Sequence, residues 1–196
     1  MQQKKNRGIG KMEISVATIS DIDAIMDLHK KFHIDSIAAE DKADGFVTTL
    51  LNREQMTSLI QNESGAFVAR DSGRIVAFVF AASWAYWSNW PFFQYMIQRL
   101  NDVTYHNEKL SVENSYQYGP ICIDKAYRGK GLLNDIFHFS LKQMAERFHY
   151  LVTFVNKNNE RSYIAHSKKL GLDVLLEFTF NNNQYYWMAC KTDQKK

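Results

Sequence analysis

The chain has 196 residues, of which 45% are apolar, 14% aromatic and 23% charged, and its formal net charge is +3. This length and apolar content predict one globular domain with a core of its own. Only two prolines and nine glycines exclude a collagen-like or low-complexity chain. The longest uninterrupted apolar stretch, residues 75–82, is much shorter than the roughly 20 residues of a transmembrane helix, so we expect no membrane partner.

The positive charge is concentrated at the two ends of the chain. Residues 1–11 carry four basic and no acidic side chains, and residues 191–196 carry three basic and one acidic, which leaves 17 basic and 20 acidic residues between them. We therefore expect one folded domain at 12–190, a disordered basic arm or tag before it, a polar tail after it, and no nucleic-acid partner. The arm lacks the apolar stretch of a secretory signal, and Cys122 and Cys190 are too few for a disulfide framework. Both features predict a cytoplasmic protein.

Hydrophobic spacing predicts an alternation of strands and helices along the whole domain. In chain order we expect a strand, two helices, two strands, an aromatic insert, and then strand, helix, strand, helix, strand and strand. The expected strands span 13–17, 65–70, 75–82, 116–124, 150–155, 174–180 and 184–190, and the expected helices span 21–31, 46–60, 131–147 and 160–170. Turn-forming residues at 71–74 predict a hairpin, and 181–183 form a similar turn between the last two strands. Pro120 marks an edge or a bulge, because proline cannot donate to a strand ladder.

Two histidines lie on the first expected helix. His29 and His33 are four residues apart, which is the spacing of two metal ligands on one helix face. Asp35 is the only further ligand type close by, and a zinc site needs three or four ligands. We therefore expect a polar flank of the helix and no metal site.

The segment at residues 84–100 is rich in aromatic side chains. Trp84, Trp87 and Trp90 lie within seven residues, and Pro91 suits the first turn of a helix that carries Phe93. Such a cluster either packs as core or lid, because aromatic side chains bury large apolar areas, or lines a pocket.

The segment at residues 121–133 has the strongest chemical signal. An apolar strand turns there through Gly129 and Gly131 into an amphipathic helix. The first amides of a helix have no intrahelical acceptor and favour a phosphate, and glycines allow the phosphate to approach the backbone. Arg128 and Lys130 add positive charge beside these amides. The segment matches neither the Walker pattern nor the glycine pattern of dinucleotide-binding folds.

Two motifs together resemble the GNAT superfamily of N-acetyltransferases. Residues 128–133 fit the pyrophosphate loop of that family, which reads Arg or Gln, any two residues, Gly, any residue, and Gly or Ala, except that Leu133 replaces the final small residue. Asn159, Ser162 and the sequence Lys-Leu-Gly-Leu at 169–172 resemble a later family helix. The order of elements resembles the family fold over nearly the whole chain.

The resemblance implies an α/β (α+β) fold with a central mixed, mostly antiparallel, splayed sheet flanked by helices. It also implies acetyl-coenzyme A (acetyl-CoA) as cofactor, with the pyrophosphate on the glycine loop and the pantetheine arm along the preceding strand. A backbone amide near Cys122 or Ile123 would then polarise the thioester carbonyl. The cofactor-binding residues implied in this way are Ile121, Cys122, Ile123, Arg128, Gly129, Lys130, Gly131, Leu132, Leu133, Asn159 and Ser162.

The implied reaction is direct attack of a primary amine, of a small molecule or a peptide, on the acetyl thioester. His166, with Ser167 as the neighbouring alternative, occupies the region of a family tyrosine and would protonate the departing thiolate. Glu113 and Tyr118 are candidates for the base, and water chains serve equally well. Cys122 is expected to be buried rather than nucleophilic, because no histidine is adjacent in sequence.

The resemblance also directs attention to the aromatic insert. We expect Trp87, Trp90 and Phe93 to contact the acceptor, with packing onto the sheet as the competing interpretation. A catalytically weak module that senses acyl-CoA is the alternative to an acetyltransferase, since Leu133 and the missing helix tyrosine depart from the family pattern. A homodimer is compatible with either function.

Overall fold

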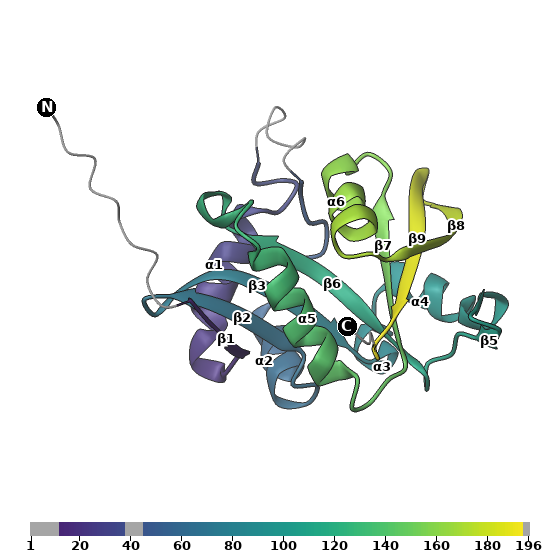
Figure 1. Ribbon diagram of the computed structural model, residues 1–196, viewed down its shortest axis with the longest axis horizontal. Helices are drawn as coiled ribbons and strands as arrows, with labels where there is room; N and C mark the ends of the chain where they lie inside the picture. The colour runs from purple at the N-terminus through teal and green to yellow at the C-terminus, as the bar shows by residue number, and fades with distance from the viewer. Residues whose placement is uncertain (1–11, 38–44, 194–196) are drawn as a thin grey trace, which may run out of the picture.

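The computed structural model describes residues 12–37 and 45–193. The expected basic arm and the last three residues of the expected tail lie outside the described residues. The described chain forms one seven-stranded sheet with helices on both faces (Figure 1). Among the described residues, no helix is long and apolar enough to cross a membrane.

Strands account for much of the described chain. They are β1 (Met12–Val16), β2 (Ala66–Asp71), β3 (Arg74–Ala82), β4 (Thr104–Tyr105), β5 (Glu108–Lys109), β6 (Ser115–Ile123), β7 (Tyr150–Asn156), β8 (Asp173–Phe180) and β9 (Asn183–Lys191). The helices are α1 (Ile22–Lys31), α2 (Arg53–Gln61), α3 (Trp84–Trp87), α4 (Pro91–Ile97), α5 (Leu132–Met144) and α6 (Glu160–Ile164). A π-helical turn, Ala165–Lys169, continues α6.

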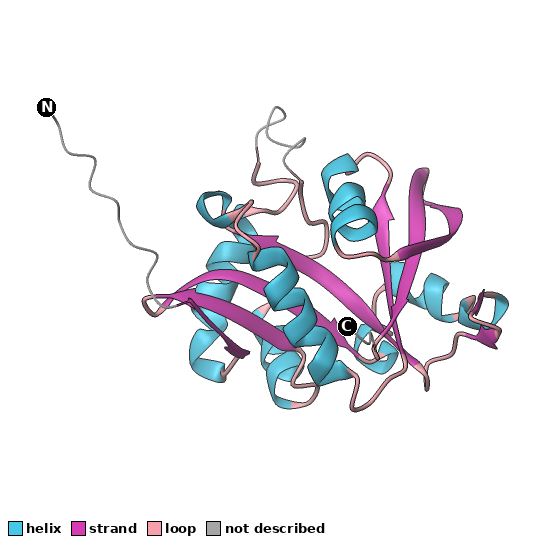
Figure 2. Cartoon of the chain, in the orientation of Figure 1, coloured by secondary structure: helices cyan, strands magenta, loops and turns pink. Residues whose placement is uncertain are grey.

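The sheet has the strand order β1-β2-β3-β6-β7-β9-β8. Every neighbouring pair is antiparallel except β6 and β7, which run parallel and pair only where Ser115–Gln117 meets Tyr150–Val152. Beyond these three pairs the two strands diverge, and Figure 2 shows the sheet opening into two arms from this point. The expectation of a mixed, mostly antiparallel and splayed sheet is confirmed.

Each face of the sheet has its own apolar core. Helices α1, α2, α3 and α4 cover one face, and α5 and α6 cover the other (Figure 1). Side chains of β6 do not keep one alternation between the two cores, because the register of β6 against β3 shifts by one residue between Tyr118 and Ile121. Tyr116 and Tyr118 face α5, whereas Cys122 faces α1.

Two of the expected turns join neighbouring strands tightly. Ser72 and Gly73 connect β2 to β3 with φ of +52° and +83°, and Asn181 and Asn182 connect β8 to β9 with φ of +45° and +61°. Positive φ at both central residues is the geometry that matches the twist of a two-residue hairpin. The expected turn residues therefore form these hairpins.

The second expected helix begins later than residue 46. Asn52 caps α2 through a reciprocal pair of hydrogen bonds: its Oδ1 accepts from the amide of Gln55, and its own amide donates to Gln55 Oε1, both at 2.8 Å. Residues 46–51 are instead extended, and Val47 bonds to the backbone at Phe32 and Ile34. The capping pair outweighs the helical spacing of the apolar residues before it.

The interpretation of His29 as part of a polar flank was wrong. Only 1% of its surface is exposed, and its ring contacts the edges or faces of Phe78 and Phe80 at centroid distances of 5.2 and 5.4 Å. Neither ring nitrogen has a hydrogen-bond partner among the described residues. Burial lowers the pKa of His29 to about 4, so the ring is neutral at pH 7.

Candidate functional site

A cleft opens where β7 diverges from β6. From Tyr118 onward, β6 is paired on its β3 edge only. The first carbonyl beyond the paired segment, that of Tyr118, accepts hydrogen bonds from Thr153 Oγ1 and Gln117 Nε2, both at 2.7 Å. These two side chains take the place of the lost strand ladder at the point of divergence.

The backbone of β6 presents unpaired groups to this cleft. The amide of Asp124 donates to the carbonyl of Val76 at 2.8 Å, so these two residues form a hydrogen-bonded pair of the β3–β6 ladder. Hydrogen-bonded pairs recur at every second residue of an antiparallel ladder. The backbone groups of Cys122 therefore point to β3, and those of Ile121 and Ile123 point to the opposite side. The two isoleucine amides have no acceptor among the described residues.

The turn between β6 and α5 forms a cradle of free amides. Gly129 and Gly131 have φ of +76° and +85°, which favours glycine at both positions. A Cβ on Gly129 would meet no atom within 4 Å, and one on Gly131 would meet only Asp135 Oδ2 at 4.0 Å. The amides of residues 129–133 donate to no acceptor in the described chain. The cradle is therefore open to an anion at the positive end of α5.

Basic side chains surround this cradle. Arg128 Nε donates to the carbonyl of Ile123 at 2.9 Å, and its guanidinium lies 5.1 Å from the ring centre of Phe32. Lys130 Nζ donates to the carbonyl of Ala126 at 2.8 Å. Arg161 and Lys169 line the same cleft, which has a volume of about 950 Å³. The cleft therefore has both the size and the charge to hold a large phosphorylated ligand.

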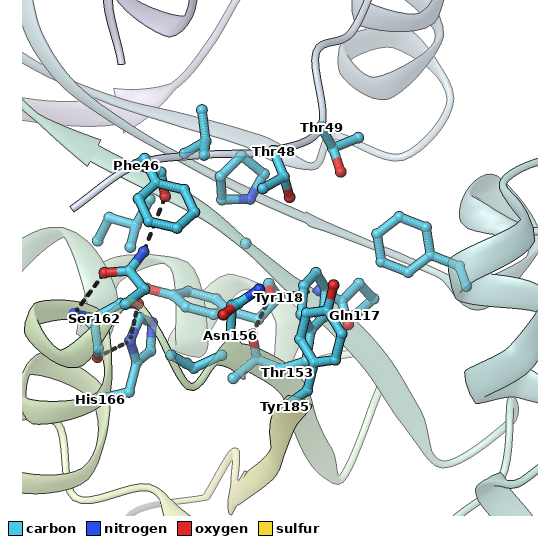
Figure 3. A pocket seen from close by; sticks show the side chains of 18 residues that line it. Phe46, Thr48, Thr49, Gln117, Tyr118, Thr153, Asn156, Ser162, His166 and Tyr185 are labelled. Carbon is cyan, nitrogen blue, oxygen red and sulfur yellow. Dashed lines mark hydrogen bonds between the residues drawn. The ribbon is translucent and has the colours of Figure 1, made fainter. Parts of the chain in front are cut away.

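The opposite wall of the cleft is the start of α6. Asn159 Oδ1 caps this helix by accepting from the amide of Ser162 at 3.1 Å, and Asn159 Nδ2 donates to the carbonyl of Phe46 at 3.1 Å. This second bond ties the extended segment 45–49 to α6 across the cleft (Figure 3). The resemblance implied that Asn159 and Ser162 bind cofactor, and both residues line the cleft.

His166 lies on the π-helical turn with 5% of its surface exposed. Its Nδ1 lies 2.7 Å from the carbonyl of Ser162, and because a carbonyl only accepts, Nδ1 carries the proton. Burial lowers the pKa of His166, so the ring is neutral at pH 7 and Nε2 holds a lone pair. The geometry therefore presents a proton acceptor, whereas the sequence interpretation had His166 as a proton donor.

A small chamber of about 90 Å³ adjoins the cleft at the point of divergence. Figure 3 shows its walls, which come from segment 46–49, α4, β6, β7, α6 and β9. Six residues line both spaces, and the region that they occupy is called the passage: Phe46, Val47, Ile121, Asn159, Ser162 and His166. The cleft and the chamber are therefore adjacent and share a wall.

The structure does not bring the two candidates for the base to this passage. Glu113 is exposed in the turn before β6 and lines neither space, and the six strand residues 115–120, which span roughly 20 Å, separate it from Ile121. Tyr118 borders the chamber, but its ring packs on Phe137 and His166, and its buried hydroxyl has no partner in the described part of the chain. Burial raises the pKa of Tyr118 well above its usual value, so the phenol stays protonated.

Cys122 lines the cleft as a buried thiol. Burial raises the pKa of this thiol, so it stays protonated at neutral pH and is a poor nucleophile. This agrees with the expectation of a packing role for Cys122.

The aromatic insert divides between packing and the chamber. Trp87 is fully buried and packs against the rings of Tyr86, Trp90 and Phe93, and neither Trp87 nor Trp90 lines the chamber. Phe93, on α4, does line the chamber. Of the three expected acceptor contacts, the structure brings only Phe93 to the site.

Several lining residues were missed from the sequence. They are Phe46, Val47, Thr48, Thr49, Gln117, Gly119, Pro120, Thr153, Phe154, Val155, Asn156 and Tyr185. A polar residue inside an otherwise apolar strand, as at positions 117 and 153, was an available signal, because a buried polar group needs a reason. The remainder come together only through the fold.

Comparison with known proteins identifies the fold. No family model matches the chain, and no curated protein does. Among solved structures, yncA from Salmonella typhimurium, solved with its cofactor acetyl-CoA, is 14% identical with a TM-score of 0.60, and the match covers 94% of this chain and 95% of that one. The ribosomal-protein-S18-alanine N-acetyltransferase from Escherichia coli is 12% identical with a TM-score of 0.60, over 95% and 97% of the two chains.

A third match is an acetyltransferase of the GNAT family from Streptococcus pneumoniae. It is 14% identical with a TM-score of 0.60, and the match covers 92% of this chain and 99% of that one. The chain therefore has the GNAT fold, as its motifs predicted.

Proposed function

We propose that this protein is an acetyl-CoA-dependent N-acetyltransferase that acts on primary amines. One observation carries the proposal: the cradle of free amides, the unpaired edge of β6 and the chamber follow one another along two adjacent spaces that share six lining residues. An anion site, an extended amide-binding edge and a small reaction chamber are the three parts that a coenzyme thioester and its acceptor require.

Acetyl-CoA supplies an acetyl group activated as a thioester. The amides of residues 129–133 suit its pyrophosphate, and Arg128, Arg161 and Lys169 add positive charge around it. The free amides of Ile121 and Ile123 suit the pantetheine arm, because an extended chain with amide groups can add to an open strand edge. Cys122, whose backbone faces β3, contributes to the wall rather than to these bonds.

His166 lies in the passage between cleft and chamber and suits the handling of the proton. Its Nε2 can accept the proton that the amine loses on attack and then return it to the departing thiolate. The bond from Nδ1 to the carbonyl of Ser162 stabilises the ring while it is transiently charged. A neutral histidine thus acts first as base and then as acid through one atom.

Two measurements test the proposal. Acetyl-CoA at about 100 times its dissociation constant should stabilise the protein against unfolding by roughly 2.7 kcal/mol. A mixture of primary amines should then release free coenzyme thiol, measured with a thiol-reactive chromophore. Absence of stabilisation would reject the coenzyme site, whereas stabilisation without thiol release from any amine would favour the acyl-CoA-sensing module.

A further inference from the structure

The chamber is uncharged, unlike the cleft that leads to it. Eighteen residues line it, and none of these described residues is Asp, Glu, Lys or Arg (Figure 3). Its titratable members are His166, Tyr118 and Tyr185, and burial favours the neutral form of all three. An acceptor that carried a carboxylate or a second ammonium here would have to bury that charge without a counter-charge.

Three aromatic rings form the wall of the chamber away from His166. They are Phe93 on α4, Phe154 on β7 and Tyr185 on β9. The ring centre of Phe154 lies 5.8 Å from that of Phe93 and 5.9 Å from that of Tyr185. Half-buried rings continue this surface outward along α4 and the β8–β9 hairpin: Phe92, Tyr95, Phe178 and Phe180. A flat apolar group can therefore extend from the chamber over these rings.

Two residues that line the chamber, Gln117 and Tyr118, carry a buried polar atom without a partner among the described residues. Of the two atoms, only Gln117 Oε1 is solely an acceptor. Gln117 Oε1 is fully buried and accepts no hydrogen bond from the described residues. Its orientation is determined, because Gln117 Nε2 donates to the carbonyl of Tyr118 at 2.7 Å and a flipped amide would place two oxygens together. A buried acceptor of this kind is satisfied by an N–H group of a ligand.

From these three features we infer that the acceptor is a primary amine on an aromatic body without a carboxylate or phosphate, its N–H group bonded to Gln117 Oε1 and its ring packed against Phe154 and Tyr185. The inference rests on the proposed acetyltransferase function. A chamber of about 90 Å³ holds the amine and the carbons next to it, and the ring lies on the aromatic surface outside.

A matched pair of acceptors tests this class. 2-Phenylethylamine and phenylalanine differ only by a carboxylate, and spermidine and an alanine-starting peptide represent polycationic and peptide acceptors. With saturating acetyl-CoA, kcat/KM for 2-phenylethylamine should exceed that for each of the others by at least about 100-fold. A preference for phenylalanine, spermidine or the peptide would overturn the inference.

A matched pair of variants tests the placement. Tyr185→Leu should raise KM for 2-phenylethylamine about 10-fold and leave KM for acetyl-CoA unchanged. Tyr186→Leu is the control, because Tyr186 is the next residue of β9, lies on the opposite face against Tyr163 and lines neither space. Equal effects of the two substitutions would overturn the placement, and the wild-type comparison above remains decisive if Tyr185→Leu fails to fold.

Direct binding separates this inference from the proposed function. Calorimetry with 2-phenylethylamine should show binding that Tyr185→Leu weakens about 10-fold and Tyr186→Leu leaves intact. Such binding without thiol release would reject the transferase function and retain the ligand class. Thiol release with charged acceptors, while 2-phenylethylamine neither binds nor reacts, would reject the class and retain the function.

Discussion

The cleft and the chamber are adjacent, but different groups of the protein form their binding surfaces. The cleft uses backbone amides from one contiguous turn, glycine conformations and exposed basic side chains. The chamber uses uncharged side chains from six separate segments, some of them buried and others partly exposed. One space thus recognises a charged group through the main chain, and the other recognises shape and apolarity through side chains.

Because of this difference, the two spaces are sensitive to different kinds of substitution. A backbone cradle keeps its amides when neighbouring side chains change, but a side chain introduced at its glycines fills the ligand position. A chamber made of side chains tolerates no buried charge, yet single ring substitutions adjust its shape. The predictions below perturb first the passage between the two spaces, then the cleft alone, and finally the support of the chamber.

The largest effect is expected at the passage. His166→Ala should lower kcat by about 10²- to 10⁴-fold and leave KM for acetyl-CoA nearly unchanged, because proton transfer contributes in the transition state. Wild-type activity should fall as pH decreases through the folded pKa of His166, which burial holds below its usual 6.5, because the ring must be neutral to accept a proton. Steady-state kinetics between pH 5 and 8 measure both effects.

Ser167→Ala is the control for His166. Ser167 Oγ donates to the carbonyl of Tyr163 at 2.7 Å, so it is bonded within its own helix and lines neither space. A loss of kcat in Ser167→Ala together with a normal His166→Ala variant would move the proton-transfer role by one residue. Loss in neither variant would leave proton transfer to water.

The cleft alone is tested at its second glycine. Gly131→Glu should abolish the stabilisation by acetyl-CoA, roughly 2.7 kcal/mol at 100 times the dissociation constant, because a negative side chain would occupy the anion position. Gly73→Glu is a matched control: Gly73 has φ of +83°, close to the +85° of Gly131, and a Cβ there meets nothing within 4 Å. The control isolates the cost of backbone strain at a glycine that does not line the cleft.

Thermal or urea unfolding with and without acetyl-CoA compares the two glycine variants. Both should lose some stability without ligand, and only Gly73→Glu should regain it with ligand. Full stabilisation of Gly131→Glu by acetyl-CoA would reject the cradle as the anion site.

Many residues of the cleft but few residues of the chamber could be predicted from the sequence, and the reason is physical. Strand alternation, Gly171 at φ +71° after the last helical turn, and the turn through Gly129 and Gly131 are local features that neighbouring residues determine. The anion cradle of the cleft is built from such features, so its residues could be named from one contiguous segment, and Asn159 and Ser162 on the opposite wall came from a second motif.

The chamber depends on residues that only tertiary structure brings together. Phe93, Phe154 and Tyr185 are ordinary strand and helix aromatics in sequence, and nothing local distinguishes them from Trp87, which packs in the core. The same limit explains the short hairpin of β4 and β5, whose turn at His106 and Asn107 has positive φ in a segment without alternating hydrophobicity. The cap at Asn52 was a further local signal that was overlooked, besides the polar residues at 117 and 153.

The smallest effect is expected from the histidine beneath the chamber wall. His29 is buried behind the segment that carries Thr49, and burial lowers its pKa to about 4 from 6.5. As pH falls below 6.5 the unfolded chain binds this proton first, so stability is full above 6.5 and is lost between 6.5 and 4. Between pH 7 and pH 5.5 this histidine alone should remove about 1.2 kcal/mol of unfolding free energy.

Urea unfolding at the two pH values measures this loss in wild type and in His29→Leu. The variant should lose about 1.2 kcal/mol less than wild type over this range, and the remaining loss includes His166, whose lowered pKa has the same sign. His138→Gln is the control, because His138 is exposed on α5 and should leave the wild-type change intact. If the unfolding free energy of His29→Leu had the same pH dependence as that of wild type, groups other than His29 would be responsible for the loss of stability in acid. The cleft, whose anion site consists of backbone amides that do not titrate, should keep its affinity for acetyl-CoA over the same range in the folded protein.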